Sequence, residues 1–73
     1  MSRTPPAEIA AELREAITSG GYAPGTRLPS ILRLSETYDV SLNFARRALR
    51  LLIDEGLAEA QHGSGHYVPP EAP

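Results

Sequence analysis

The sequence lacks cysteine altogether, and all seven of its basic residues are arginine, with no lysine among its 73 residues. Without cysteine, disulfide bridges and cysteine-based zinc sites are excluded. A chain of this length has room for one thin core in a single domain. Such a core argues against a cleft with several catalytic side chains and favours a module that works with its outer surface. We therefore expect no enzyme, no metal and no other cofactor.

Long hydrophobic runs are also missing from the sequence. No apolar run approaches the roughly 18 residues that a membrane-spanning helix needs. The first residues, Met1 to Pro6, lack the apolar stretch of a signal peptide. The sequence therefore predicts a cytoplasmic protein that has no membrane partner.

The net charge of the chain is only −2, which by itself speaks against a protein that binds polyanions with its whole surface. The charge is unevenly distributed, however: residues 1–26 carry −1, residues 27–50 carry +3, and residues 51–73 carry −4. The guanidinium of arginine is planar and suits hydrogen bonding to phosphate and guanine. The middle of the chain is therefore the part expected to meet a polyanion.

Hydrophobic periodicity predicts three helices, at residues 7–19, 31–38 and 42–55. Each predicted helix follows a residue whose side chain can accept a hydrogen bond from the first turn: Thr4, Ser30 and Ser41. Pro5 is expected at the first position of the first helix, where the missing amide costs nothing. Asp39 tolerates the left-handed conformation expected between the second and third helices.

The third predicted helix has two different faces. One is an apolar stripe, and the other carries Asn43, Arg46, Arg47 and Arg50. A solvated face is the plainer interpretation of such arginines. The tight turn before this helix favours instead the second helix of a helix-turn-helix, whose exposed side chains enter the major groove of DNA.

After Gly56 the pattern changes to that of strands. Residues 57–61 and 65–68 predict a β-hairpin, with glycines near its tip where a positive φ is needed. Pro24-Gly25 predicts a type II turn, and residues 26–28 can form a short extended segment after it. The predicted fold is mainly α with a small β-hairpin wing: a winged helix-turn-helix of three helices and a two- or three-stranded antiparallel sheet. It occupies residues 1–68, and residues 69–73 form a proline-rich tail or a truncated linker.

An ordered series of motifs runs through residues 7–68. It includes Leu28-Pro29-Ser30, Val40-Ser41, Arg46-Arg47-Ala48-Leu49, Glu55-Gly56-Leu57 and Gly63-Ser64-Gly65. In this series the chain resembles the N-terminal DNA-binding domain of the GntR family of bacterial transcription regulators. The resemblance implies binding to double-stranded operator DNA, as a homodimer on a palindromic site, and repression relieved by a small molecule. It also implies an effector-binding C-terminal domain, which this sequence does not contain.

The chain departs from the family pattern at positions where the family usually carries DNA-contacting or basic residues. Leu32 and Leu42 stand where the family usually has arginine, Phe44 where threonine is frequent, and His62 where a basic residue often precedes the wing glycine. Two interpretations remain open. Leu42 and Phe44 could touch thymine methyl groups, or they could form an apolar patch that binds another protein.

The resulting candidate interface has three parts. At the start of the third helix, the residues expected to face bases are Ser41, Leu42, Asn43 and Phe44. The residues expected to bind phosphate or guanine are Arg46, Arg47 and Arg50. The residues expected to hold the DNA backbone or to form the wing tip are Ser30, Arg33, His62, Gly63 and Ser64. The main alternative is a winged helix that binds protein and has weakened DNA binding, and Phe44 could instead be partly buried.

Overall fold

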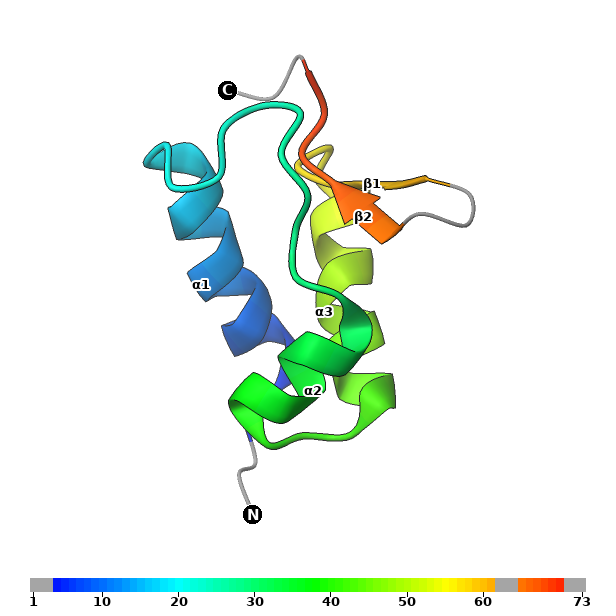
Figure 1. The fold of residues 1–73 in the computed structure, drawn as a ribbon. Helices are drawn as coiled ribbons and strands as arrows, with labels where there is room; N and C mark the ends of the chain where they lie inside the picture. Colours follow the sequence, from blue (N-terminus) through cyan, green and yellow to red (C-terminus); the bar gives the residue numbers. More distant parts are fainter. Residues whose placement is uncertain (1–3, 62–64, 71–73) are drawn as a thin grey trace.

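Three helices and a small antiparallel sheet make up the part of the chain that the computed structural model describes, residues 4–61 and 65–70. The helices are α1 (Pro6–Thr18), α2 (Ile31–Tyr38) and α3 (Leu42–Asp54), and the strands are β1 (Glu59–Gln61) and β2 (Gly65–Tyr67). Figure 1 shows α1 and α3 side by side, α2 in front of their lower ends, and the hairpin beyond the end of α3. The predicted winged helix-turn-helix is confirmed.

Two serine hydroxyls start α2 and α3, as predicted. The Oγ atom of Ser30 accepts the N–H of Arg33 at 3.0 Å, and the Oγ atom of Ser41 accepts the N–H of Phe44 at 3.1 Å. Each bond satisfies one of the amides that the first turn of a helix leaves unpaired. Between the two helices, Asp39 adopts the predicted left-handed conformation, with φ 53°.

The prediction that Thr4 caps α1 is wrong. The capping position is occupied by Pro5 in an extended conformation, and Pro6 is the first helical residue. The proline ring has no acceptor, so no side chain caps this helix. Pro6 therefore takes the first helical position that was predicted for Pro5, and it loses no helical hydrogen bond there.

One face of each helix forms a core that is entirely apolar among the described residues. The contribution of α3 is almost completely buried and consists of Ala45, Ala48, Leu49 and Leu52. Because two of these side chains are single methyl groups, little side chain separates α3 from its neighbours. The remaining buried hydrophobic residues are Ile9, Ala10, Leu13, Ile17, Leu28, Leu34, Val40, Leu57, Ala58 and Val68.

Within the described residues, the sheet has two strands, and one isolated bridge lies beside it. β1 and β2 pair antiparallel, with Ala60 opposite His66. The segment before α2 joins them through a bridge between Arg27 and Tyr67, and the N–H of Leu28 donates to the carbonyl oxygen of His66 at 2.8 Å. Of the two predicted forms of the sheet, the structure therefore has the two-stranded one, and the segment before α2 is attached to it by this single bridge.

Both strands are shorter than predicted. Residues 57 and 58 lie outside β1, and their side chains are buried in the core instead. The predicted turn at Pro24-Gly25 is present: the N–H of Thr26 donates to the carbonyl oxygen of Ala23 at 3.0 Å, and Gly25 has φ +86°, as a type II turn requires at that position. This turn directs the chain into the segment that pairs with β2.

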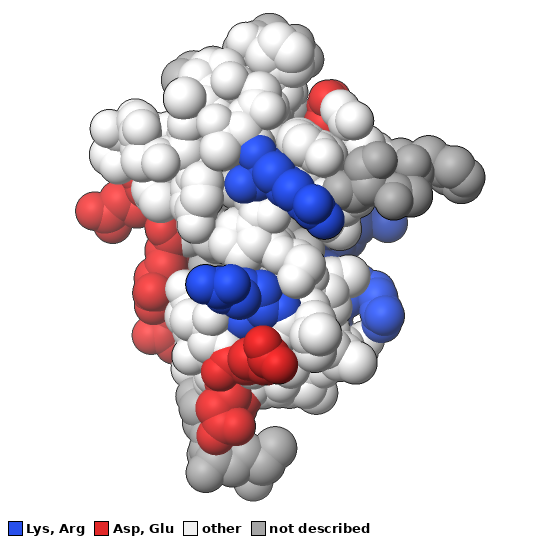
Figure 2. All heavy atoms as spheres, viewed as in Figure 1, with Lys and Arg blue, Asp and Glu red and all other residues white. Residues whose placement is uncertain are grey.

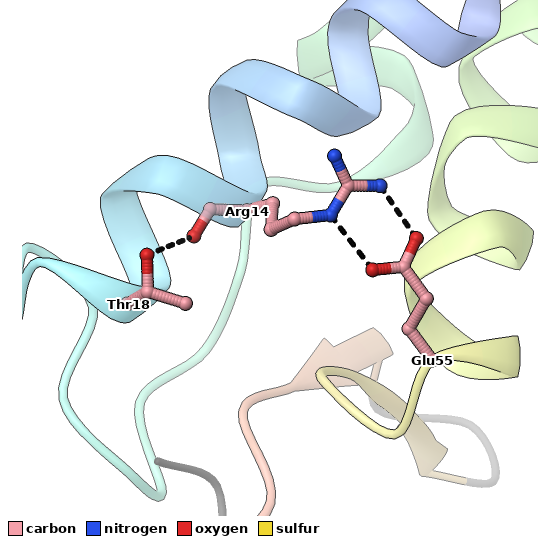
Figure 3. A network of polar contacts seen from close by, with 3 residues as sticks. All are labelled: Arg14, Thr18 and Glu55. Carbon is pink, nitrogen blue, oxygen red and sulfur yellow. Dashed lines mark hydrogen bonds and ion pairs between the residues drawn. The ribbon is translucent and has the colours of Figure 1, made fainter.

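Two polar contacts connect α1 to the other helices. The guanidinium of Arg14 forms a two-pronged ion pair with the carboxylate of Glu55, just after α3, with Nε 2.7 Å from Oε1 (Figure 3). The hydroxyl of Tyr38, at the end of α2, donates to Oε1 of Glu12 at 3.0 Å. Burial and the bond to Glu12 raise the pKa of Tyr38 to about 12, so this hydroxyl stays protonated at neutral pH. None of the described helices is long and apolar enough to cross a membrane.

The leucines at positions 51 and 52 provide a test of the core. Leu52 is fully buried, whereas Leu51 is 37% exposed. We expect Leu52→Ala to lower the free energy of unfolding by about 2–5 kcal/mol, because it removes buried contacts and leaves a cavity. Leu51→Ala, the same chemical change one residue earlier, is expected to alter it by only about 0.5 kcal/mol. Urea denaturation measures both values, and equal losses would contradict this packing.

The ion pair between Arg14 and Glu55 makes stability depend on pH. The hydrogen bonds from Arg14 hold the pKa of Glu55 below its ordinary value of 4.5. A lowered pKa in the folded state adds stability that is present above the ordinary value and lost as the pH falls through the folded value. We therefore expect Glu55→Gln to be less stable than the wild type at about pH 7, and the difference to shrink at about pH 3. Urea denaturation at both pH values measures the difference in free energy of unfolding between the two proteins. A difference that stays constant would show that the ionised pair does not contribute to stability.

Candidate nucleic-acid interface

The exposed side of α3 is polar and basic. Seven residues of α3 are exposed, and the last two of them are Leu51 and Asp54. The other five are called here the outer face of α3: Leu42, Asn43, Arg46, Arg47 and Arg50. They fall together because residues three and four positions apart share one side of a helix. The predicted separation into an apolar face and an arginine face is therefore confirmed.

The three arginines of this outer face have different surroundings. Arg46 has no ion-pair or hydrogen-bond partner within the described residues, apart from those of the helix backbone. Arg47 lies over the ring of Phe44, with its Cζ atom 5.8 Å from the ring centroid. Arg50 faces Asp54, with Nε 3.3 Å from Oδ1, but both side chains are more than half exposed, so water weakens this pair. Arg46 is consequently the arginine of this face that is most available to an external anion.

The first turn of α3 contains no charged residue. Ser41 is engaged at the helix cap, and Phe44 is half-buried and packs against the core. Leu42 is 48% exposed, and the neighbouring Asn43 is also exposed. Of the four residues predicted to face bases, the structure thus directs Leu42 and Asn43 outward and anchors Phe44.

A hollow of about 360 Å³ opens at the start of α2. It is lined by Tyr22, Arg27, Leu28, Pro29, Ser30 and Arg33. Two of the six are arginines, and the N-terminus of a helix carries a partial positive charge. The hollow can therefore accept a negatively charged group such as a phosphate.

Arg27 belongs to this surface, although the sequence did not mark it as a site residue. A Cβ atom added at Gly65, which has φ +102°, would lie 3.0 Å from Nη2 of Arg27. The guanidinium therefore lies against the backbone of the wing, at the same hollow as Arg33. The bridge between Arg27 and Tyr67 places it there, and no sequence motif signals that pairing.

His66 adds no positive charge to the described part of the wing. Burial lowers the pKa of His66, so this imidazole is neutral at pH 7. The predicted wing-tip residues His62, Gly63 and Ser64 lie outside the described residues. The basic group that the structure places against the wing is the guanidinium of Arg27.

Basic and acidic side chains are unevenly distributed on the surface. Figure 2 shows basic side chains across the middle and right of one face, where α2, α3 and the hairpin meet. Acidic side chains lie along its left edge, over α1, and in its lower middle, over α2 and beside the basic ones. The acidic residues of α1 are Glu8, Glu12 and Glu15. Within the described part of the chain, no three histidine or acidic side chains come together as a metal site would require. The basic part of the surface, at the start of α2 and on the outer face of α3, is therefore the part that suits a polyanion.

Comparison with known proteins assigns the family. Residues 5–68 match the family described as bacterial regulatory proteins, gntR family. The chain belongs to this family. Its members are regulatory proteins, which are not a class of enzymes.

Two relatives from Escherichia coli strain K12 illustrate the similarity. The Uxu operon transcriptional regulator is 37% identical over 67 residues, and the mannosyl-D-glycerate transport/metabolism system repressor MngR is 39% identical over 64 residues. The matches cover 92% and 88% of this chain but only 26% and 27% of the relatives. The chain therefore spans about a quarter of the length of these gntR-family relatives.

Solved structures share the fold of this gntR-family chain. YtrA from Sulfolobus acidocaldarius, a GntR-family transcription factor, is 33% identical with a TM-score of 0.84, and the match covers 97% of this chain and 76% of YtrA. The DNA-binding domain of AraR, in complex with operator ORX1, is 27% identical with a TM-score of 0.82, and that match covers 86% and 76% of the two chains. The chain thus has the winged helix-turn-helix fold of DNA-binding domains in this family.

Proposed function

We propose that this domain binds double-stranded DNA in a sequence-specific way, as part of a transcription regulator that acts in the cytoplasm on the nucleoid. The single observation that carries the proposal is the outer face of α3, on which three arginines follow an uncharged first turn. The related AraR domain, which is bound to its operator, supports it.

The dimensions and chemistry of α3 suit the major groove. Its 13 residues form a rod about 20 Å long, and the groove, about 12 Å wide, admits one helix. In this position the first turn, with Leu42 and Asn43, meets base edges. Arg46, Arg47 and Arg50 lie on later turns, where guanidinium groups bind phosphate or guanine.

The start of α2 and the wing hold the DNA backbone in this proposal. Ser30 and Arg33, joined by Arg27, bind a phosphate at the hollow before α2, where the amides of the first turn also attract an anion. His62, Gly63 and Ser64 remain the predicted contacts of the wing with the minor groove or its phosphates.

Membership of the gntR family supports an inference about how the domain is assembled on DNA. We infer that residues 1–68 form the DNA-binding unit and that residues 69–73 begin a linker to an effector-binding domain. We infer further that two copies bind a palindromic operator and repress transcription, and the name of MngR, a repressor, supports the repressing role. A dimer would hold two α3 helices about one turn of DNA apart.

Arg46 provides the test of this function. We expect Arg46→Ala to weaken binding to all duplex sequences to a similar extent, and to lower the slope of log affinity against log salt concentration by about 0.9, the value for one phosphate contact. Fluorescence anisotropy over a salt series measures the slope.

Arg46→Lys is the matched control, because it keeps the charge and is expected to keep the slope. Circular dichroism checks that both variants remain folded. An unchanged slope and affinity in Arg46→Ala would remove Arg46 from the interface.

Two exposed leucines favour a second candidate function, the binding of another protein. Leu32 is 59% exposed and Leu42 48% exposed, at positions where the family pattern has arginine. A folded domain that binds no duplex even at low salt would favour this function over DNA binding.

A further inference from the structure

Only two side chains of the first turn of α3 are free to meet a base. Ala45 is fully buried, and Phe44 packs against the core beneath Arg47. Leu42 and Asn43 are exposed and adjacent. Since DNA-reading helices of this kind contact bases with residues near their N-terminus, these two side chains are the ones that read the bases under the first turn of α3.

Contacts of the residues before and after Leu42 and Asn43 fix the first turn of α3. The cap bond from the N–H of Phe44 to Oγ of Ser41, 3.1 Å long, fixes the start of the helix. The half-buried ring of Phe44 anchors the next residue. Leu42 and Asn43 therefore project from a fixed backbone, which lets a difference of one methyl group on the DNA affect binding.

The side chain of Leu42 has no hydrogen-bonding group, and this limits which bases it can contact favourably. Its side chain can gain only from apolar contact, and the apolar group that ordinary DNA offers in the major groove is the 5-methyl of thymine. A guanine or cytosine edge at the same place would lose hydrogen bonds to water without replacement. The exposed leucine thus favours thymine.

The hydrogen-bonding groups of Asn43 favour the same kind of base pair, A·T. Its side-chain amide has one acceptor and two donors, and it matches the N6 and N7 atoms of adenine with two hydrogen bonds. We propose that Leu42 and Asn43 give this domain a preference for A·T base pairs under the first turn of α3, Leu42 contacting a thymine methyl and Asn43 an adenine. This inference rests on the proposed function, in which α3 lies in the major groove.

The surroundings of Leu42 favour DNA over a protein as its partner. Arg46 lies one turn along the same side of α3 and has no side-chain partner within the described residues, and Arg50 follows one turn further. An apolar protein surface would bury the Arg46 charge without compensation. Duplex DNA offers a partner to both Leu42 and Arg46, because its phosphates lie beside the groove that contains the thymine methyl groups.

The test removes single methyl groups from the DNA. Duplexes selected by the 73-residue chain from a random pool are first sequenced, and each thymine in the selected site is then replaced by deoxyuridine, which differs only by the 5-methyl. We expect one replacement per half-site to weaken binding by the wild type about fourfold, the loss expected for one methyl group. In Leu42→Ala the same replacement is expected to change the affinity by less than about twofold, by the same scale.

Two further variants complete the design. Leu51→Ala makes the same truncation on the last turns of α3 and is expected to keep the fourfold difference. Asn43→Ala is expected to lose the preference for adenine when the selection is repeated. Selected sites without A·T pairs, or a methyl effect that is the same in Leu42→Ala, would overturn the inference while leaving DNA binding in place. No binding of any duplex at low salt would contradict the proposed function itself, and this inference with it.

Discussion

The inner face of α3 is the constraint on which the rest of the structure depends. The helix α3 packs against both other helices, and the residues of its inner face, Ala45, Ala48, Leu49 and Leu52, are almost completely buried. A chain of 73 residues without cysteine has no disulfide to stabilise it, so this packing carries most of the stability. Because the inner face must be buried, the opposite face must be exposed. The residues that meet a partner are thereby fixed by the residues that form the core.

The contacts at the two ends of α3 hold that exposed face in place. Ser41 fixes the first turn, and Glu55, just after the helix, is bound by Arg14 of α1. The hairpin that follows is joined to the segment before α2 through the bridge between Arg27 and Tyr67. The acidic residues of α1 lie along the left edge of Figure 2, away from most of the basic side chains, whereas Asp54 lies beside Arg50 on α3 itself. A small net negative charge is therefore compatible with a basic surface on one side of the molecule.

Most of the fold could be predicted from the sequence because local signals agree with the packing. The apolar period of α3, the serine caps and the left-handed Asp39 all concern residues within one turn of each other. Thr4 failed as a cap because two consecutive prolines follow it and either can start a helix. Arg27 was missed because its place depends on pairing with Tyr67, forty residues later, which no local pattern reveals. Phe44 was ambiguous because a single aromatic residue at a helix start suits both solvent and core, and packing decides between them.

The central claim is that α2 and α3 present one surface to duplex DNA. The most direct measurement is to follow the backbone amide NMR signals of the chain during titration with a duplex at low salt. The largest shifts are expected for residues 30–33 and 41–47, with little change for residues 8–15 on the acidic side of α1. Shifts centred on α1, or none at all at saturating duplex, would contradict the claim.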